Sequence, residues 1–394
     1  MAQSRAWTAP VSSLPAVPVV PPSSDPSPLP AAWQPALHGL RGIACVMIVL
    51  HHLAVYHPLL AAQLVRSTLR PEVFFVVSGA LYRRSMWPLA GATALRAFVA
   101  RLLRRIYPTY LLFLLLAAAG YYAKHWALHH GAGARFRSAS VYDQDPWVFV
   151  KNLLLVQDVW PRTTASLNYP SWAISDFLWV AAACAALCAG LRGHARGAAL
   201  AALAIAGYAV VLRFPGSPGF DLARCAAGFV TGIGAASLAQ RLGAPRAWGG
   251  WLAVAGAAGA LALMQFDGLV AQPFACMPPC AALMVLGLSI APRSRIARGL
   301  EWAPLVALGR LSYTIILAHA LVLIAVERLL ERFAGVRCGV ADGPCEHGLG
   351  LAATLGVIGV VLGASVALSA LVQRVADRWR TPRRTRAPAQ LETA

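Results

Sequence analysis

The chain has 394 residues, of which 58% are hydrophobic and 12% are charged, and its mean hydropathy is +0.61. A soluble domain carries about 25% charged residues, so this composition excludes an ordinary water-soluble fold and indicates a polytopic membrane protein. The formal net charge is +19, from 34 lysines and arginines against 15 aspartates and glutamates. On a soluble protein such a charge would suggest nucleic-acid binding. On a membrane protein it belongs in loops and tails, and no nucleic-acid partner is expected.

Apolar stretches of about 17–25 residues predict transmembrane helices. Ten such stretches lie near residues 39–57, 71–88, 104–123, 171–191, 197–213, 222–240, 247–266, 270–291, 303–326 and 349–372. The expected fold class is therefore all-α, a polytopic membrane helix bundle. We expect a disordered Pro/Ser-rich tail at 1–34, a membrane domain at 35–375 and a basic tail at 376–394.

The arginines predict the orientation of the bundle. With the N-terminus inside, most of them fall in cytoplasmic connections, as the positive-inside rule requires. Both termini are therefore expected in the cytoplasm. Cys338 and Cys345 flank a polar loop on the opposite side, where a disulfide and a pair of free thiols are both open interpretations.

The first predicted helix carries ionisable side chains, which are costly inside a membrane and are therefore functional candidates. Arg41 and His52 are eleven residues apart, so they share one helical face. The rise between them is about 16 Å, which predicts Arg41 at the cytoplasmic rim and His52 near mid-membrane. His51 points about 80° away from Arg41, which favours His52 as a base. A histidine bonded to a neighbouring carbonyl is the structural alternative.

The next two predicted helices carry a carboxylate and a group of arginines. Glu72 lies at the outer entrance of the second helix, where it could orient a histidine or serve as a simple rim carboxylate, and Ser78 lies deeper. Ser-Gly pairs such as Ser78–Gly79 are common at close helix contacts. The arginines of the third helix could anchor the cytoplasmic side or bind phosphate, to which guanidinium groups are well suited. They are Arg96, Arg101, Arg104 and Arg105.

Two later helices add polar groups. Trp172 and Asp176 are i,i+4 neighbours near the outer surface, where they could stack on and hydrogen-bond a sugar, although interfacial tryptophans are commonly membrane anchors. His319 follows Tyr313 on the ninth helix and is a second intramembrane histidine. No histidine spacing suggests a metal site.

Together these motifs resemble acyltransferase family 3, a family of integral-membrane O-acyltransferases. The resemblance covers about residues 35–375, and one difference is Phe177 where the family has Glu, with Asp176 one position earlier. It rests on LHGLRGIACVMIVLHH, EVFFVVSGALY, RLLRRIYPTYLL, NYPSW and LGRLSYTIILAH.

The resemblance implies that His52 is the essential catalytic residue, that Arg41 is its partner, and that the Arg101–Arg105 group lies on the acyl-donor side. It implies a multi-pass protein of the bacterial inner (plasma) membrane that transfers an acyl group, expected to be acetyl, from acyl-CoA to a sugar. The acceptor would be a polysaccharide or its lipid-linked precursor.

We expect no tightly bound cofactor, with acyl-CoA as co-substrate. Asp176 or Glu72 would support His52, while Trp172, Ser78, Tyr313 and His319 would contact substrate. A transporter or flippase for a lipid-linked or polyanionic solute is the alternative function.

Overall fold

The computed structural model describes residues 34–53, 69–130, 147–159, 166–243, 245–266, 271–335 and 349–380. Within these ranges the chain forms helices and no strands, which confirms the all-α prediction. The loop from Cys338 to Cys345 lies outside the described residues, as do nearly all of the N-terminal tail and most of the C-terminal tail.

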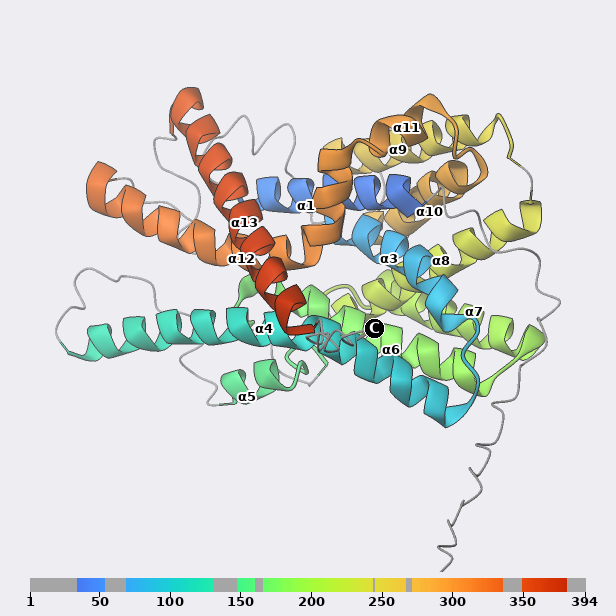
Figure 1. The fold of residues 1–394 in the computed structure, drawn as a ribbon, viewed down its shortest axis with the longest axis horizontal. Helices are drawn as coiled ribbons and strands as arrows, with labels where there is room; N and C mark the ends of the chain where they lie inside the picture. The colour runs from blue at the N-terminus through green and yellow to red at the C-terminus, as the bar shows by residue number, and fades with distance from the viewer. Residues whose placement is uncertain are drawn as a thin grey trace, which may run out of the picture.

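The helices follow one another in the order shown in Figure 1. They are α1 (Gln34–Leu53), α3 (Arg70–Met86), α4 (Gly91–His129), α5 (Val148–Leu153), the 3-10 turn η5 (Tyr169–Ser171), α6 (Trp172–Gly190), α7 (Gly193–Arg213), α8 (Phe220–Leu242), α9 (Gly249–Gln265), α10 (Pro273–Ile290), α11 (Arg295–Leu300), α12 (Ala303–Ala334) and α13 (Leu351–Arg380).

Eight of the described helices are long and apolar enough to cross a membrane: α1, α4, α6 with η5, α7, α8, α10, α12 and α13. The other two predicted spans correspond to α3 and α9, which have 17 residues each. The chain is therefore a polytopic helical membrane bundle, as its composition predicts.

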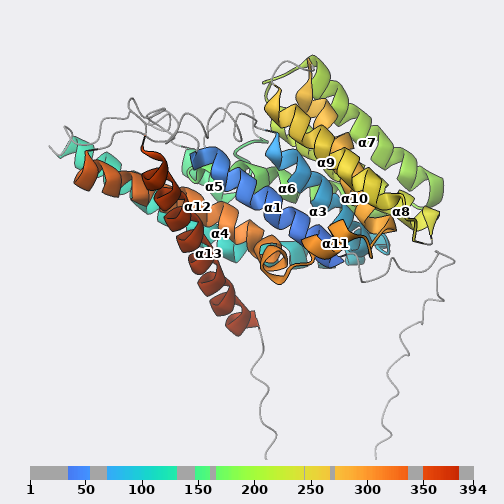
Figure 2. The ribbon, with the colours of Figure 1, turned by 90° about the horizontal axis from the view of Figure 1, so that it is seen from above.

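The bundle has a central group of helices with a group on either side. Figures 1 and 2 show α1, α3 and α6 between α7–α10 at one end and α12 and α13 at the other. The most extensive contacts are those of α9 with α10, α1 with α12, and α3 with α8. Helices that are distant in sequence therefore build the centre of the molecule.

Glycines allow α12 to approach α1 closely, and α3 to approach α8. A Cβ on Gly309 of α12 would lie 1.8 Å from the carbonyl oxygen of His38 in α1, and one on Gly79 of α3 would lie 1.9 Å from that of Phe229 in α8. Both contacts are with backbone, which cannot move aside without shifting a helix. Small residues permit such contacts between membrane helices, so the Ser78–Gly79 pair has a packing role.

Several helices extend beyond the predicted spans. The third predicted span, near residues 104–123, lies within a longer helix, because α4 begins at Gly91 and continues through its internal Pro108. Arginine is a good helix former, so the basic stretch before the apolar window stays helical. Likewise α12 continues to Ala334 and α13 to Arg380, past the expected domain boundary at 375.

Candidate functional site

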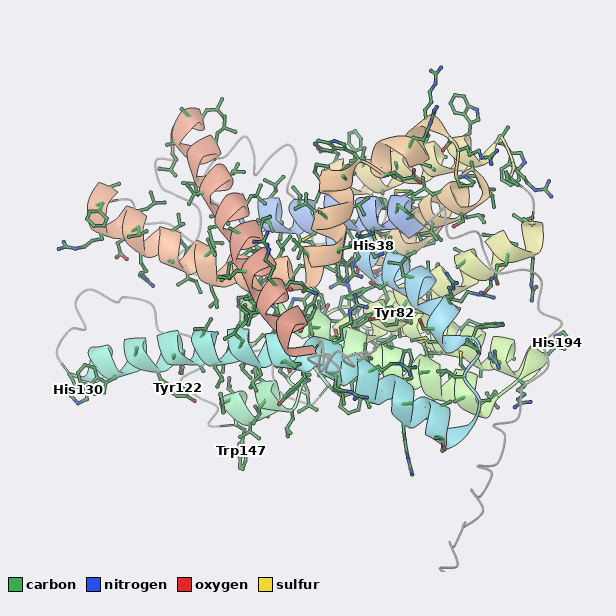
Figure 3. All side chains as sticks on the ribbon, in the orientation of Figure 1. His38, Tyr82, Tyr122, His130, Trp147 and His194 are labelled. Atoms are coloured by element: carbon green, nitrogen blue, oxygen red, sulfur yellow. The ribbon has the colours of Figure 1, made fainter. Side chains whose placement is uncertain are left out.

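The centre of the bundle contains a cavity of about 260 Å³. Its walls come from α1, α3, α4, α6 with η5, α8 and α12, with one residue from α13. Figure 3 places His38 and Tyr82, which both line it, at the centre of the bundle, whereas His130 and His194 lie at opposite ends. The cavity combines apolar walls with convergent polar groups, which is typical of a ligand site.

One end of the cavity is cationic. Arg41 from α1, Arg105 from α4 and Arg310 from α12 all line it, and all three interact electrostatically with His38. The guanidinium of Arg41 lies over the ring of Phe74, 4.2 Å from its centroid, and its Nε is buried without a hydrogen-bond partner. Guanidinium groups gathered from three helices suit the phosphates of a ligand.

The other arginines of the predicted donor group lie outside this cavity. Arg101 and Arg104 are exposed on α4 and do not line it, and the Nε of Arg104 donates to the carbonyl oxygen of Ala100, 3.1 Å away in the same helix. The structure thus brings Arg41 and Arg105 together and adds Arg310.

His52 lies where three aromatic rings meet. Its ring centroid is 5.0 Å from that of Tyr169, edge-on, and 5.2 Å from that of His319, stacked at 30°. His52 is in the last described turn of α1, at the end of the candidate span Pro35–Leu53. The depth of His52 in the membrane stays a prediction, because residues 54–68, which include the rest of the predicted span, lie outside the described residues.

His51, which the helical wheel places about 80° away from Arg41, also lies at the cavity. Both histidines line the cavity, and their ring centroids are 5.2 Å apart. An 80° offset on one helix does not remove a side chain from a cavity that surrounds the helix end. Contact with Tyr169 and His319 distinguishes His52 instead.

His319 is buried behind His52. Its Nδ1 lies 3.2 Å from the carbonyl oxygen of Ile315, which can only accept, so Nδ1 carries the proton. Its Nε2 is buried and has no hydrogen-bond partner. Tyr313, one of the expected substrate-binding residues, lines the cavity and donates to the carbonyl oxygen of Ile106 at 2.9 Å.

The turn before α6 is held in place by side-chain hydrogen bonds to backbone carbonyls of other segments. Asn168 donates to the carbonyl oxygen of Leu317 in α12 at 2.9 Å, and Ser175 donates to that of Leu155 at 2.6 Å. These bonds fix η5 and the first turn of α6. Tyr169 and Trp172 are thereby positioned in the cavity wall.

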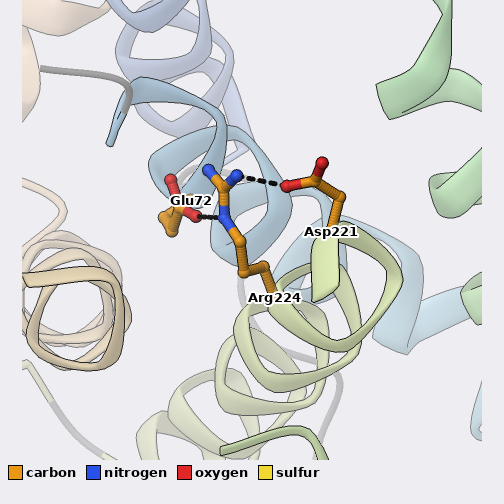
Figure 4. Close-up of polar contacts among 3 residues, drawn as sticks. All are labelled: Glu72, Asp221 and Arg224. Carbon is orange, nitrogen blue, oxygen red and sulfur yellow. Dashed lines mark hydrogen bonds and ion pairs between the residues drawn. The ribbon is translucent and has the colours of Figure 1, made fainter. Parts of the chain in front are cut away.

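At the end of the cavity near Tyr169 and Trp172, which we call the second end, an arginine pairs with two carboxylates, as Figure 4 shows. The Nε of Arg224 in α8 is 2.5 Å from a carboxylate oxygen of Glu72 in α3, and its Nη1 pairs with Asp221 one turn earlier in α8. The guanidinium also lies 4.2 Å from the ring centroid of Phe274 and 5.7 Å from that of Trp172. Arg224 and Asp221 line the cavity.

The two carboxylates expected to support His52 lie elsewhere. Glu72 is fully buried in the ion pair with Arg224 and does not line the cavity. Asp176 is fully buried and faces Asp158, and neither of its oxygens has a hydrogen-bond donor. Ser78 is buried outside the cavity wall, without a hydrogen-bond partner. The structure does not bring these three side chains to His52.

Sequence analysis missed four residues that shape the cavity: Tyr169, Asp221, Arg224 and Arg310. Tyr169 and Arg310 stand inside the NYPSW and LGRLSY motifs. Arg224 is a charged residue within a predicted span, so the rule that selected Arg41 could also have selected it.

Among the described residues, no group of three or more His, Cys, Asp or Glu side chains could hold a metal ion. A family model described as an acyltransferase domain matches residues 34–373, which is most of the chain. Searches for similar curated proteins and for similar solved structures each found no match. The matched region includes every described residue that lines the cavity.

Proposed function

Because the chain belongs to this family of membrane acyltransferases, we propose that it is an O-acyltransferase that moves an acyl group from acyl-CoA to a sugar hydroxyl, with His52 as general base. One observation carries the proposal: a single cavity holds His52 and, away from it, three arginines from three helices. A CoA thioester has phosphates at one end and a reactive carbonyl at the other, which matches this arrangement.

The donor would bind with its phosphates against Arg41, Arg105 and Arg310. Arg101 and Arg104, on the same helix as Arg105 but outside the cavity lining, would contribute to the approach of the anion. The thioester would extend along the apolar wall toward His52. The arginine bias of the loops supports a cytoplasmic donor, and the His52 end would then face the outer side of a bacterial inner membrane.

The reaction would proceed by attack of a sugar hydroxyl on the thioester carbonyl carbon. His52 takes the hydroxyl proton as the new C–O bond forms. The C–S bond then breaks, and the CoA thiolate takes the proton from His52, so that the products are the ester and the CoA thiol. Expected acceptors are a polysaccharide or its lipid-linked precursor, and the expected acyl group is acetyl.

His52→Ala tests the role of the base, with His51→Ala as the matched control because it removes a second imidazole from the same cavity wall. General-base catalysis contributes about 100- to 10,000-fold. We therefore expect His52→Ala to lower acyl transfer by at least about 100-fold, with acyl-CoA affinity retained. His51→Ala should keep most of the transfer activity.

Transfer would be followed with radiolabelled acetyl-CoA and purified protein, and donor affinity by equilibrium binding. Full transfer by His52→Ala, or a complete loss confined to His51→Ala, would contradict the assignment. A purified protein that does not bind acyl-CoA would refute the proposed function itself.

A further inference from the structure

The two ends of the cavity differ in charge. Arg41, Arg105 and Arg310 gather at one end, and the described residues that line the cavity include one carboxylate, Asp221, which lies at the other. There Arg224 faces both Asp221 and Glu72, so one positive charge meets two negative ones. The carboxylate that this second end presents to the cavity is therefore Asp221, close to Tyr169 and His52.

Asp221 is placed to meet a ligand. Its side chain is 35% exposed, whereas Glu72 and Arg224 are 0% and 6% exposed. An ionised carboxylate has about four acceptor positions, and Arg224 engages one oxygen of Asp221. The remaining positions are available on the cavity side, where Asp221 interacts electrostatically with Tyr169, the residue in ring contact with His52.

Aromatic surfaces complete this end. Trp172 and Tyr169 line the cavity on either side of Pro170. Phe75 packs edge-on against Trp172, with 6.3 Å between ring centroids, and fixes its ring plane. Aromatic faces beside a carboxylate are suited to a ring that is apolar on its faces and carries hydroxyls at its edge.

We infer that Asp221, Trp172 and Tyr169 form the acceptor-binding subsite, in which Asp221 accepts a hydrogen bond from a hydroxyl of a neutral sugar and Arg224 positions Asp221. The inference rests on the proposed function and specifies its acceptor. Asp221 takes the role that sequence analysis gave to Asp176.

The same charges exclude anionic acceptors. A uronic acid at this end would place its carboxylate beside Asp221, and like charges in a poorly hydrated site repel strongly. Phosphates would instead be attracted to the arginine end. The separation of charge thus directs the donor and the acceptor to opposite ends of one cavity.

Asp221→Asn tests the subsite. The change is isosteric and the residue is partly exposed, so the fold should tolerate it. Acetyl transfer from acetyl-CoA would be measured with purified protein and two sets of probes. One set is the methyl glycosides of glucose, galactose and mannose, and the other is the corresponding methyl uronosides.

The wild type should acetylate neutral glycosides and discriminate against the uronosides. Asp221→Asn should raise the KM for the neutral glycosides about tenfold, the loss expected for one hydrogen bond to a charged group, and should reduce the discrimination. Its affinity for acetyl-CoA should not change. Glu331→Gln is the control, since Glu331 and Arg328 form a similar i,i+3 ion pair on α12 outside the cavity.

Three results would overturn the inference. They are an unchanged KM and discrimination in Asp221→Asn, equal use of uronosides by the wild type, and acetyl-CoA binding without transfer to any neutral glycoside. Failure of the wild type to bind acetyl-CoA is a separate result, which refutes the proposed function.

Discussion

The partly buried Asp158 and the buried Asp176 form a carboxyl pair beside the acceptor end. Asp158 is outside the spanning helices, and burial raises the pKa of its carboxyl above the ordinary value, with Asp221 adding to the rise. Asp176 and Arg224 act in the opposite direction. The folded protein therefore binds this proton more tightly than the unfolded chain, and its stability falls as the pH rises from about 4 through the raised pKa.

Asp158→Asn should remove this pH dependence, because an amide is neutral at every pH and can donate to Asp176. We expect the variant to unfold at a temperature a few degrees above the wild type at neutral pH, with the difference disappearing near about pH 4. Thermal unfolding in detergent at both pH values measures this effect. Glu331→Gln should show no such change, and an Asp158→Asn variant less stable than the wild type at neutral pH would refute the explanation.

Single residues differ in how far the sequence predicts them. The spacing of Arg41 and His52 depends only on helix geometry, and both side chains line the cavity. The pairing of Glu72 with Arg224 joins residues 152 positions apart. A helical wheel describes one helix and cannot show which neighbour a face meets, so Asp176 and Asp221 could not be distinguished from sequence.

At the scale of elements, the contact between α3 and α8 depends on glycine. A Cβ on Gly232 of α8 would lie 1.9 Å from the carbonyl oxygen of Val76 in α3, whereas one on Gly234 meets nothing within 4 Å. These two positions on one helix offer a matched pair. Since α3 carries Glu72 and α8 carries Arg224, the contact also sets the distance across the ion pair.

Gly232→Ala should destabilise the protein by about 1–3 kcal/mol, since the helices must separate, and should lower acyl transfer. Gly234→Ala should be neutral or stabilising by about 0.5–1 kcal/mol, because alanine is the better helix former. Thermal unfolding of the purified variants measures both changes. Equal stability of the two variants would show that the α3–α8 contact is not tight.

The ten predicted spans all correspond to helices because a long apolar stretch must be helical to satisfy its backbone in lipid. Their ends were harder to predict. Hydropathy marks the part of a helix that lies in the membrane, while α4 begins with a basic segment, Gly91–Arg105, that is equally helical. Which helices become neighbours depends on contacts such as that of Gly309 with α1, and the composition of a helix does not predict such contacts.

On the scale of the whole molecule, the arginines fall into two groups, those that line the cavity and those that do not. Arg105 and Arg310, 205 positions apart in sequence, converge with Arg41 on the cavity, while Arg101 and Arg104 on α4 do not line it. Composition alone treats all of them as one basic excess. Under the proposed function, the arginines that line the cavity are the ones that would contact the bound donor.

Arg310→Ala and Arg105→Ala should therefore each weaken acyl-CoA binding by about tenfold or more, the loss expected for a charge-assisted hydrogen bond to phosphate. Arg101→Ala and Arg104→Ala are the matched controls, because these two arginines do not line the cavity, and they should change the affinity by less than about threefold, as is usual for surface charges. Equilibrium binding of acetyl-CoA, measured without an acceptor, compares the four variants. An equal loss of affinity in all four variants would mean that the arginines act as a general basic surface. The separation of charge along the cavity would then no longer explain how the donor and the acceptor bind at different ends.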